Sequence, residues 1–171
     1  MPPTTHPATW DVESLLEQCD CRRQRRSGPG GQHRNKVETA VVLTHHPTGV
    51  QGEASERRSQ EQNRRQAIFR LRVNLALSVR ALSPGQPIQP SPLWQKYCHG
   101  RQIAIGATHS DYPAMLAEAL DVLAALDLRI PDTAASLGCS ATQLTRFLKT
   151  EPRALRDINQ HRAARGLKPL R

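Results

Sequence analysis

Long apolar runs, cysteines and acidic residues are all scarce in this 171-residue chain. No stretch reaches the roughly 20 apolar residues that a membrane-spanning helix needs, so the chain is not expected to enter a bilayer. Residues 1–17 contain acidic residues but neither lysine nor arginine, which is unlike secretory and mitochondrial leaders. We therefore expect a cytoplasmic protein.

The four cysteines, Cys19, Cys21, Cys98 and Cys139, are too few and too scattered for a disulfide framework. Cys19 and Cys21 would share one face of a strand, which favours a role as small buried side chains. Their spacing is not the paired C-x-x-C of zinc sites, although a site that joins them to Cys98 and His99 is an alternative. We expect no metal and no cofactor.

Basic residues outnumber acidic ones, and the imbalance lies in one part of the chain. The sequence has 24 Lys and Arg against 15 Asp and Glu, a formal net charge of +9. Residues 22–80 hold 13 of the basic residues and 4 of the acidic ones, so the rest of the chain is neutral in sum. This concentration favours binding to phosphate groups, with an affinity that falls as salt rises, and the alternative is a solvated surface.

The most informative segment is residues 27–36, which reads SGPGGQHRNK. Three glycines around one proline shape exposed backbone, because glycine takes positive φ and lets a partner approach without a Cβ between them. Four arginines precede this segment, and Arg34 and Lys36 follow its tip at Gln32. The sequence therefore predicts an exposed loop that contacts a polyanion.

Three blocks in a fixed order carry a family resemblance. They read G-x-G-G-Q-x-x-N-K from Gly28, T-H-x-P-T-G from Thr44 and E-R-x-S-Q-x-x-N-R from Glu56. Residues 15–80 thus resemble the catalytic domain of class I peptide chain release factors and of small ribosome-rescue hydrolases. The resemblance implies a loop that enters the peptidyl transferase centre and promotes hydrolysis of the ester between the nascent peptide and tRNA.

The resemblance implies a catalytic set of Gly30, Gly31 and Gln32. The two glycines allow close approach, the backbone N–H of Gln32 stabilises the transition state, and its side-chain amide places water. The loop contains no Asp or Glu as a dedicated base, and His33 as a general base is the alternative. The implied RNA-binding residues are Arg25, Arg26, Gly28, His33, Arg34, Asn35, Lys36, Arg57, Arg58, Ser59, Gln60, Asn63, Arg64 and Arg65.

The sequence departs from the family pattern at Pro29, where alanine or serine is usual, and at Arg34, which replaces a small apolar residue. Both changes are compatible with a site walled by RNA. Factors that read stop codons carry further domains around the catalytic module, and few residues precede the loop here. We therefore expect codon-independent release from stalled ribosomes or separated large subunits. The implied partners are ribosomal RNA, peptidyl-tRNA and a glutamine methyltransferase, with the protein as a monomer.

The expected fold class is α+β, beginning with a short antiparallel or mixed sheet and a long helix. Residues 10–17 suit a helix capped by Thr9 or Asp11, and residues 19–25, 37–44 and 50–54 suit strands. A tight turn is expected at residues 46–49.

Ser55 is expected to cap the long helix, which would continue to about Leu82, with Glu56 near the positive end of its dipole. Ala67, Leu71, Leu75 and Leu82 recur at helical spacing and would face the sheet. Arg58, Arg65 and Arg72 recur every seven residues and form a candidate RNA-facing stripe.

The second half of the chain has a different pattern. Residues 83–92 contain four prolines and suit an extended connector, while residues 93–110 are poorly specified. A helix is expected from Tyr112 to before Pro131, and another over residues 153–165. Residues 134–148 look like a helix-turn-helix, with Gly138 at the turn and Ser140 as the cap of the second helix. The expected domains are 1–82, a linker segment over 83–110, and an all-α unit over 111–171.

The candidate recognition helix would present Thr142, Gln143, Arg146 and Lys149 to nucleic acid. The same helix pair also serves as plain packing or as a protein-binding bundle. Rescue hydrolases of the family have a lysine-rich tail at this place, so a charge-balanced helical unit is a departure from them. The competing function is a nucleic-acid-binding regulator with a non-catalytic glycine loop. A hydrolase of free peptidyl-tRNA is disfavoured, because no catalytic dyad surrounds Gln32.

Overall fold

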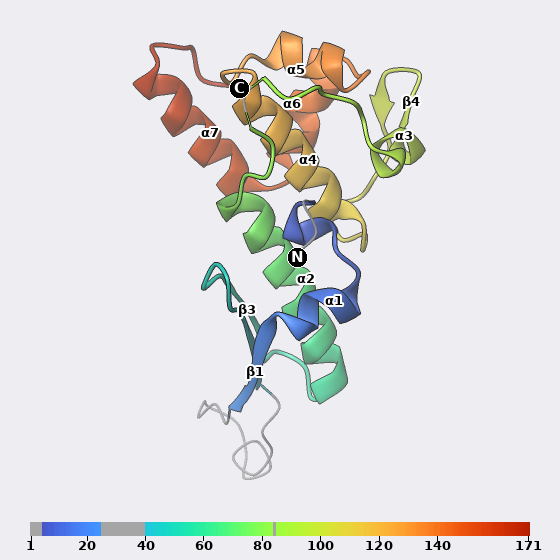
Figure 1. The fold of residues 1–171 in the computed structure, drawn as a ribbon, viewed down its shortest axis with the longest axis vertical. Helices are drawn as coiled ribbons and strands as arrows, with labels where there is room; N and C mark the ends of the chain where they lie inside the picture. The colour runs from blue at the N-terminus through green and yellow to red at the C-terminus, as the bar shows by residue number, and fades with distance from the viewer. Residues whose placement is uncertain (1–4, 25–39, 84) are drawn as a thin grey trace. The chain divides into compact units, whose positions relative to one another are not determined.

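The computed structural model describes residues 5–24, 40–83 and 85–171 and divides the chain into two compact units (Figure 1). The first unit is Pro7–Val79, and the second is Arg80–Arg171 together with Met1–His6. A small antiparallel sheet with a long helix makes up most of the first unit, and helices dominate the second. The α+β class predicted from the sequence is therefore confirmed.

The sheet of the first unit has the order β1–β2–β3, and both strand pairs are antiparallel. The strands are β1 (Cys19–Gln24), β2 (Ala40–His45) and β3 (Gln51–Ala54). Val41, Leu43 and His45 are buried on the central strand, whereas Val42 between them is half-buried. Burial therefore alternates from Val41 to His45, whereas Ala40 at the start of β2 is buried beside Val41. The turn into β3 contains Gly49 at φ +69°, as its sequence requires.

Helices cover this sheet. The short η1 (Pro7–Thr9) and α1 (Val12–Glu17) come first, and Asp11 caps α1 by accepting a hydrogen bond from the Ser14 N–H at 2.9 Å. The long α2 (Gln60–Ser78) runs alongside the sheet and packs on β2 and β3 (Figure 1). Ala67, Leu71 and Leu75 are fully buried on its inner face, as the helical spacing predicts.

The prediction of a helix from Ser55 to Leu82 was wrong at both ends. Ser59, not Ser55, caps α2, because the Ser55 N–H donates to the Glu56 carboxylate and residues 55–59 stay outside the helix. At the other end Val79 is extended, at φ −102° and ψ 146°. The Ala81 N–H then donates to the Asp121 carboxylate instead of a helical carbonyl.

Gly52 on β3 allows the sheet to approach the backbone of α2 closely. A Cβ at Gly52 would lie 2.4 Å from the Ala67 carbonyl oxygen and 2.4 Å from the Leu71 backbone nitrogen. Both are backbone atoms, which no rotamer change moves aside. A glycine inside a strand often indicates such an approach, and the sequence analysis made no use of this signal.

The second unit is built around α4 (Tyr112–Ala125), in which 11 of 14 residues are buried. A helix that is apolar on all sides is an interior helix, so α4 is the centre of this core. The other helices of this unit are α3 (Pro92–Tyr97), α5 (Ile130–Ser136), α6 (Ala141–Lys149) and α7 (Pro152–Ala164). No helix in the described parts of the chain has the length and apolar character that crossing a membrane would require.

The segment expected as linker and unspecified chain contributes ordered elements to the second unit. It contains α3 and a hairpin of β4 (Cys98–His99) and β5 (Gln102–Ile103). Trp94 of α3 is fully buried, and its indole N–H donates to the Leu137 carbonyl at 2.8 Å. Its ring also meets that of Phe147 edge-on at 6.0 Å. These contacts join α3 to the helix pair that follows.

The predicted helix pair is present as α5 and α6. Gly138 has a φ of +69° between them, a conformation that favours glycine. Ser140 caps α6 by accepting a hydrogen bond from the Gln143 N–H at 3.2 Å. Leu144 and Phe147 point inward and are buried.

We expect Gly52→Ala to lower the free energy of unfolding by about 3 kcal/mol, because the added methyl group forces β3 away from α2. Urea unfolding of the purified chain measures this change. Gly106→Ala is the matched control, since nothing lies within 4 Å of a Cβ there, and it should cost less than about 0.5 kcal/mol. Equal unfolding midpoints for the two variants would show that the close approach is absent.

Asp121 on α4 makes stability depend on pH. It is 6% exposed, and burial raises the pKa of its carboxyl to about 6 from 3.8, although the Ala81 N–H and Arg80 oppose the shift and Glu118 adds to it. Between these values the folded chain binds more protons than the unfolded chain, so stability falls as pH rises from about 4 to 6. Asp121→Asn should remove this loss, which is on the order of 3 kcal/mol.

Urea unfolding at several pH values between about 2 and 7 tests this expectation. Asp111→Asn is the control with the opposite sign, because the Tyr97 O–H donates to Asp111 at 2.8 Å and lowers the pKa of that carboxyl. The stability that Asp111 adds is present above pH 4 and is lost as pH falls. Parallel curves for the native chain and Asp121→Asn would contradict the role of Asp121.

Candidate nucleic-acid interface

Three segments of the first unit meet at one end of its sheet. β1 ends at Gln24, whose register partner Ala40 begins β2. β3 ends at Ala54, and its partner Val41 is the next residue of β2. Residues 25–39 therefore join the sheet at the same end at which the chain passes from β3 towards α2 (Figure 1). We call this the loop end of the sheet.

Most of the predicted catalytic loop lies outside the described residues. This applies to the three catalytic residues Gly30, Gly31 and Gln32. It also applies to the RNA-binding candidates Arg25, Arg26, Gly28, His33, Arg34, Asn35 and Lys36. Their roles stay predictions from the sequence.

Asn63 holds the segment between β3 and α2 in place. Its side chain is fully buried, Oδ1 accepts from the Arg57 N–H at 2.9 Å, and Nδ2 donates to the Arg57 carbonyl at 2.8 Å. The backbone N–H and carbonyl of Arg57 thus bond to the two ends of the Asn63 side-chain amide. The expectation that Asn63 contacts RNA is corrected, because a buried amide with these partners positions Arg57 instead.

Glu56 makes a second tie between this segment and α2. The Arg70 guanidinium donates to the Glu53 carbonyl at 2.8 Å and to the Glu56 carboxylate. That guanidinium, together with the Ser55 N–H, lowers the pKa of Glu56 to about 2. Glu56 is therefore an ion-pair partner of Arg70 rather than a residue of the first helical turn.

These two ties leave three predicted RNA contacts exposed at the loop end. The side chains of Arg57, Arg58 and Arg64 face solvent, and no acidic partner for them occurs among residues 5–24, 40–83 and 85–171. Arg22 and Arg23 are also exposed, on β1 just before the loop. Exposed guanidinium groups without carboxylate partners are free to bind phosphate.

Other predicted contacts already have partners within the protein. Arg65 forms an ion pair with Glu61, with 3.0 Å between Nε and Oε1. The Ser59 hydroxyl caps α2, and the half-buried Gln60 is the first residue of that helix. The proposed stripe of Arg58, Arg65 and Arg72 was wrong, because Arg58 precedes α2 and Arg72 donates to the Ala8 carbonyl at 3.0 Å.

The second sequence block forms a turn rather than a chemical site. His45 is 1% exposed, and its Nδ1 lies 2.8 Å from the Thr48 hydroxyl. The Trp10 ring packs edge-on against it at 6.0 Å. Burial lowers the pKa of His45, so the imidazole is neutral at physiological pH.

Cysteine burial differs from the expectation. Cys21 is exposed, while Cys19 is half-buried and its thiol donates to the Leu15 carbonyl at 3.1 Å. Burial raises the pKa of Cys19 to about 11, which keeps it a thiol. Over the residues that the structure describes, no group of three or more His, Cys, Asp and Glu side chains is placed to hold a metal ion.

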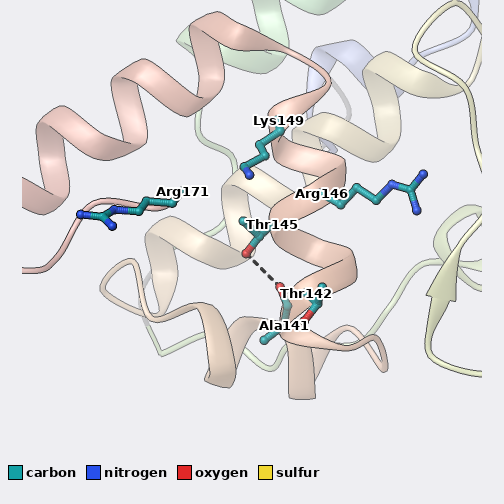
Figure 2. Close-up of a pocket in the computed structure, with 6 residues that line it drawn as sticks. All are labelled: Ala141, Thr142, Thr145, Arg146, Lys149 and Arg171. Atoms are coloured by element: carbon teal, nitrogen blue, oxygen red, sulfur yellow. Dashed lines mark hydrogen bonds between the residues drawn. The ribbon is translucent and has the colours of Figure 1, made fainter.

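The second unit presents most of its predicted recognition residues on the outer face of α6. Thr142, Arg146 and Lys149 are exposed there. Gln143 is half-buried, and its side-chain oxygen accepts a hydrogen bond from the Ile103 N–H at 3.4 Å. The exposed three line an open hollow of about 400 Å³ together with Ala141, Thr145 and Arg171 (Figure 2). Arg171 is not among the residues predicted from the sequence for this face.

Comparison with known proteins finds similarity in the first half of the chain. Residues 11–87 match the model of the RF-1 domain. Peptide chain release factor 1 of Acidiphilium cryptum is 44% identical over 77 residues, which are 44% of this chain and 22% of the relative. Peptide chain release factor PrfB1 of the Arabidopsis thaliana chloroplast is 49% identical over 64 residues, or 37% of this chain and 14% of the relative.

Peptide chain release factor 2 of Paramagnetospirillum magneticum is 43% identical over 67 residues, which are 39% of this chain and 18% of the relative. The chain spans about a fifth of the length of the curated relatives that it matches. No solved structure matches it significantly.

We expect Asn63→Ala to weaken two properties together. Loss of both hydrogen bonds to Arg57 should lower the free energy of unfolding by about 2 kcal/mol, because a buried amide is removed and residues 55–59 are released. The affinity of the candidate interface for RNA should also fall several-fold, since Arg57 and Arg58 are no longer held at the loop end. Thermal unfolding and fluorescence anisotropy with an RNA duplex measure the two changes.

Gln62→Ala is the neighbouring control, because Gln62 is exposed on α2 and only its backbone N–H takes part in the cap. It should leave both properties within error of the native chain. Native stability in Asn63→Ala would show that the buried amide does not hold this segment.

Proposed function

Residues 11–87 make this chain similar to class I release factors, and we propose that it promotes ribosome-dependent hydrolysis of the ester of peptidyl-tRNA. The bond that breaks joins the carbonyl carbon of the nascent peptide to the terminal ribose oxygen of the tRNA. Water supplies the attacking oxygen, and the products are a free peptide carboxylate and a deacylated tRNA.

One observation carries this proposal. The segment with the Gly-Gly-Gln sequence joins the sheet at the end where Arg22, Arg23, Arg57 and Arg58 are exposed. A polyanion that binds these arginines would therefore have the loop close to the surface of the polyanion. The ribosomal peptidyl transferase centre is such an environment, because its walls are RNA.

The residues of the loop supply positioning rather than proton transfer. Gly30 and Gly31 permit the backbone to come close to the reacting ester, and the Gln32 N–H is a donor for the charge that develops in the transition state. The side-chain amide of Gln32 both donates and accepts, so it can orient the attacking water. The surrounding RNA supplies the remaining groups.

The finer part of the proposal is that release does not depend on a stop codon. The family match ends at residue 87, and the helices α3–α7 that follow it form a unit with its own core. We therefore place this protein with factors that act on stalled ribosomes or on separated large subunits, in the cytoplasm. Modification of Gln32 by a methyltransferase is part of the same proposal.

Gln32→Ala should reduce the single-turnover rate of peptide release by about 100-fold while ribosome binding stays unchanged, because the amide that places water is lost. The measurement uses ribosomes stalled with peptidyl-tRNA and compares a stop codon, a sense codon and an empty codon position. We expect the native protein to release peptide at similar rates from all three.

Gln66→Ala, an exposed glutamine on α2, is the control and should retain full activity. A fully active Gln32→Ala protein would remove the catalytic assignment. His33→Ala tests the alternative in which His33 is the general base. In that case the release rate of the native protein would follow the titration of the imidazole, and His33→Ala would remove this pH dependence. Specific binding to duplex DNA without any hydrolysis would favour the regulator instead.

A further inference from the structure

The hollow on the outer face of α6 combines three cations with two hydroxyl groups. Arg146 and Lys149 lie in the last turns of α6, and Arg171 lies in the segment that follows α7. Thr142 and Thr145 lie on the same face, and the Thr145 hydroxyl donates to the Ala141 carbonyl at 2.9 Å (Figure 2). We call these five residues the α6 surface.

The cations of the α6 surface differ from others of the same unit in lacking an acidic partner. Lys96, Arg129, Arg153 and Arg156 each lie within 3.5 Å of a carboxylate oxygen. No Asp or Glu side chain in the described part of the chain has a carboxylate oxygen within 4.0 Å of the cationic groups of Arg146, Lys149 or Arg171. Gathering unpaired positive charge around a hollow is unfavourable for the free protein, and an anionic ligand relieves it.

The directions of these side chains favour an extended anion over a small one. In Figure 2 the Arg146 guanidinium extends to one side of α6, whereas Arg171 extends away to the other side and Lys149 lies between them. The three charges therefore do not converge on one point, as a site for a single phosphate or carboxylate ion would require. A row of phosphates along a nucleic acid strand matches a spread arrangement.

One side of the beginning of α6 is covered by protein. A recognition helix contacts base edges with its N-terminal residues. Here the Ser140 N–H donates to the Arg101 carbonyl at 3.1 Å, and Gln143 accepts from Ile103, so the β4–β5 hairpin packs beside this end of the helix. The cations stand instead at its C-terminal end. This arrangement of the cations suits contact with the phosphate backbone of a nucleic acid rather than with its bases.

We propose that the α6 surface binds the phosphate backbone of double-helical RNA without reading its sequence. The choice of RNA rests on the proposed function, because a factor that acts on the ribosome meets RNA helices. It also agrees with the chemistry, since proteins contact A-form helices through phosphates and 2′-hydroxyl groups. The exposed Thr142 hydroxyl can donate to a phosphate or exchange a hydrogen bond with a 2′-hydroxyl.

Fluorescence anisotropy with the full chain and RNA duplexes of about 20 base pairs in two unrelated sequences tests this proposal. Arg146→Gln/Lys149→Gln should bind both duplexes about tenfold more weakly at moderate salt. The slope of log affinity against log salt should fall by about 2, one unit for each lost phosphate contact. Arg129→Gln/Arg156→Gln removes the same charge from cations that already have partners, and should change neither quantity.

Footprinting of the native chain gives a readout that needs no variant. An amine-reactive acylating reagent should modify Lys149 less in the presence of the RNA duplex, while Lys96 of the same unit should react equally with and without RNA. Lys96 is a matched control because it is exposed and pairs with Asp111. Unchanged reactivity of Lys149 would overturn the proposal, as would equal RNA affinity of the two double variants.

Two further outcomes separate this proposal from its rivals. Tighter, sequence-dependent binding to DNA duplexes through Arg146 and Lys149 would overturn it in favour of a regulator. The Gln32→Ala protein should retain native RNA affinity and the native footprint. If the native chain releases no peptide and yet Lys149 is protected by RNA, the proposed function fails and the α6 surface stands. If release is normal and Lys149 is not protected, the α6 surface fails alone.

Discussion

The contact between Gly52 of β3 and the backbone of α2 sets the geometry on which the candidate site depends. Because the backbone atoms of Ala67 and Leu71 occupy the space that a side chain at Gly52 would need, β3 and α2 lie at a fixed short separation. The chain between them must then turn within residues 55–59, at the loop end of the sheet. This turn places Arg57 and Arg58 next to the point at which residues 25–39 join the strands. A packing constraint in the core thus determines where positive charge stands on the surface.

Residues that share one sequence block divide into two groups with different physical roles. Asn63 and Glu56 point to protein partners, the first to the backbone of Arg57 and the second to Arg70. Arg57, Arg58 and Arg64 point to solvent. The polar residues of the first group hold the turn, and the cations of the second group are what the turn presents. The block therefore combines residues that shape the turn with residues that form its exposed cationic surface.

Sequence reasoning succeeded where a local pattern has one physical solution. The helical spacing of Ala67, Leu71 and Leu75 and the turn at Gly138 with its cap at Ser140 both have this character. It failed where two local solutions compete, as at Ser55 and Ser59. Both are good caps, and contacts with residues further along the chain, Glu56 with Arg70 and Arg57 with Asn63, keep residues 55–59 outside the helix. It also could not assign residues 93–110, because Trp94 is buried by partners distant in sequence, such as Leu137 and Phe147.

Charge summed over a segment also hides how charge is arranged in space. Outside residues 22–80 the basic and acidic residues cancel, so the charge sum by itself did not indicate a cationic surface there, and only the helix-turn-helix pattern pointed to Arg146 and Lys149. In the folded second unit several carboxylates are taken up by particular cations, such as Glu151 by Arg153 and Asp132 by Arg129. Among the described residues, the positive charge of Arg146 and Lys149 is left without an acidic partner at the α6 surface. The balance outside residues 22–80 also hides an excess of positive charge in the second unit, because residues 81–171 hold 11 Lys and Arg against 7 Asp and Glu, and the compensating acids lie in residues 11–20 of the first unit.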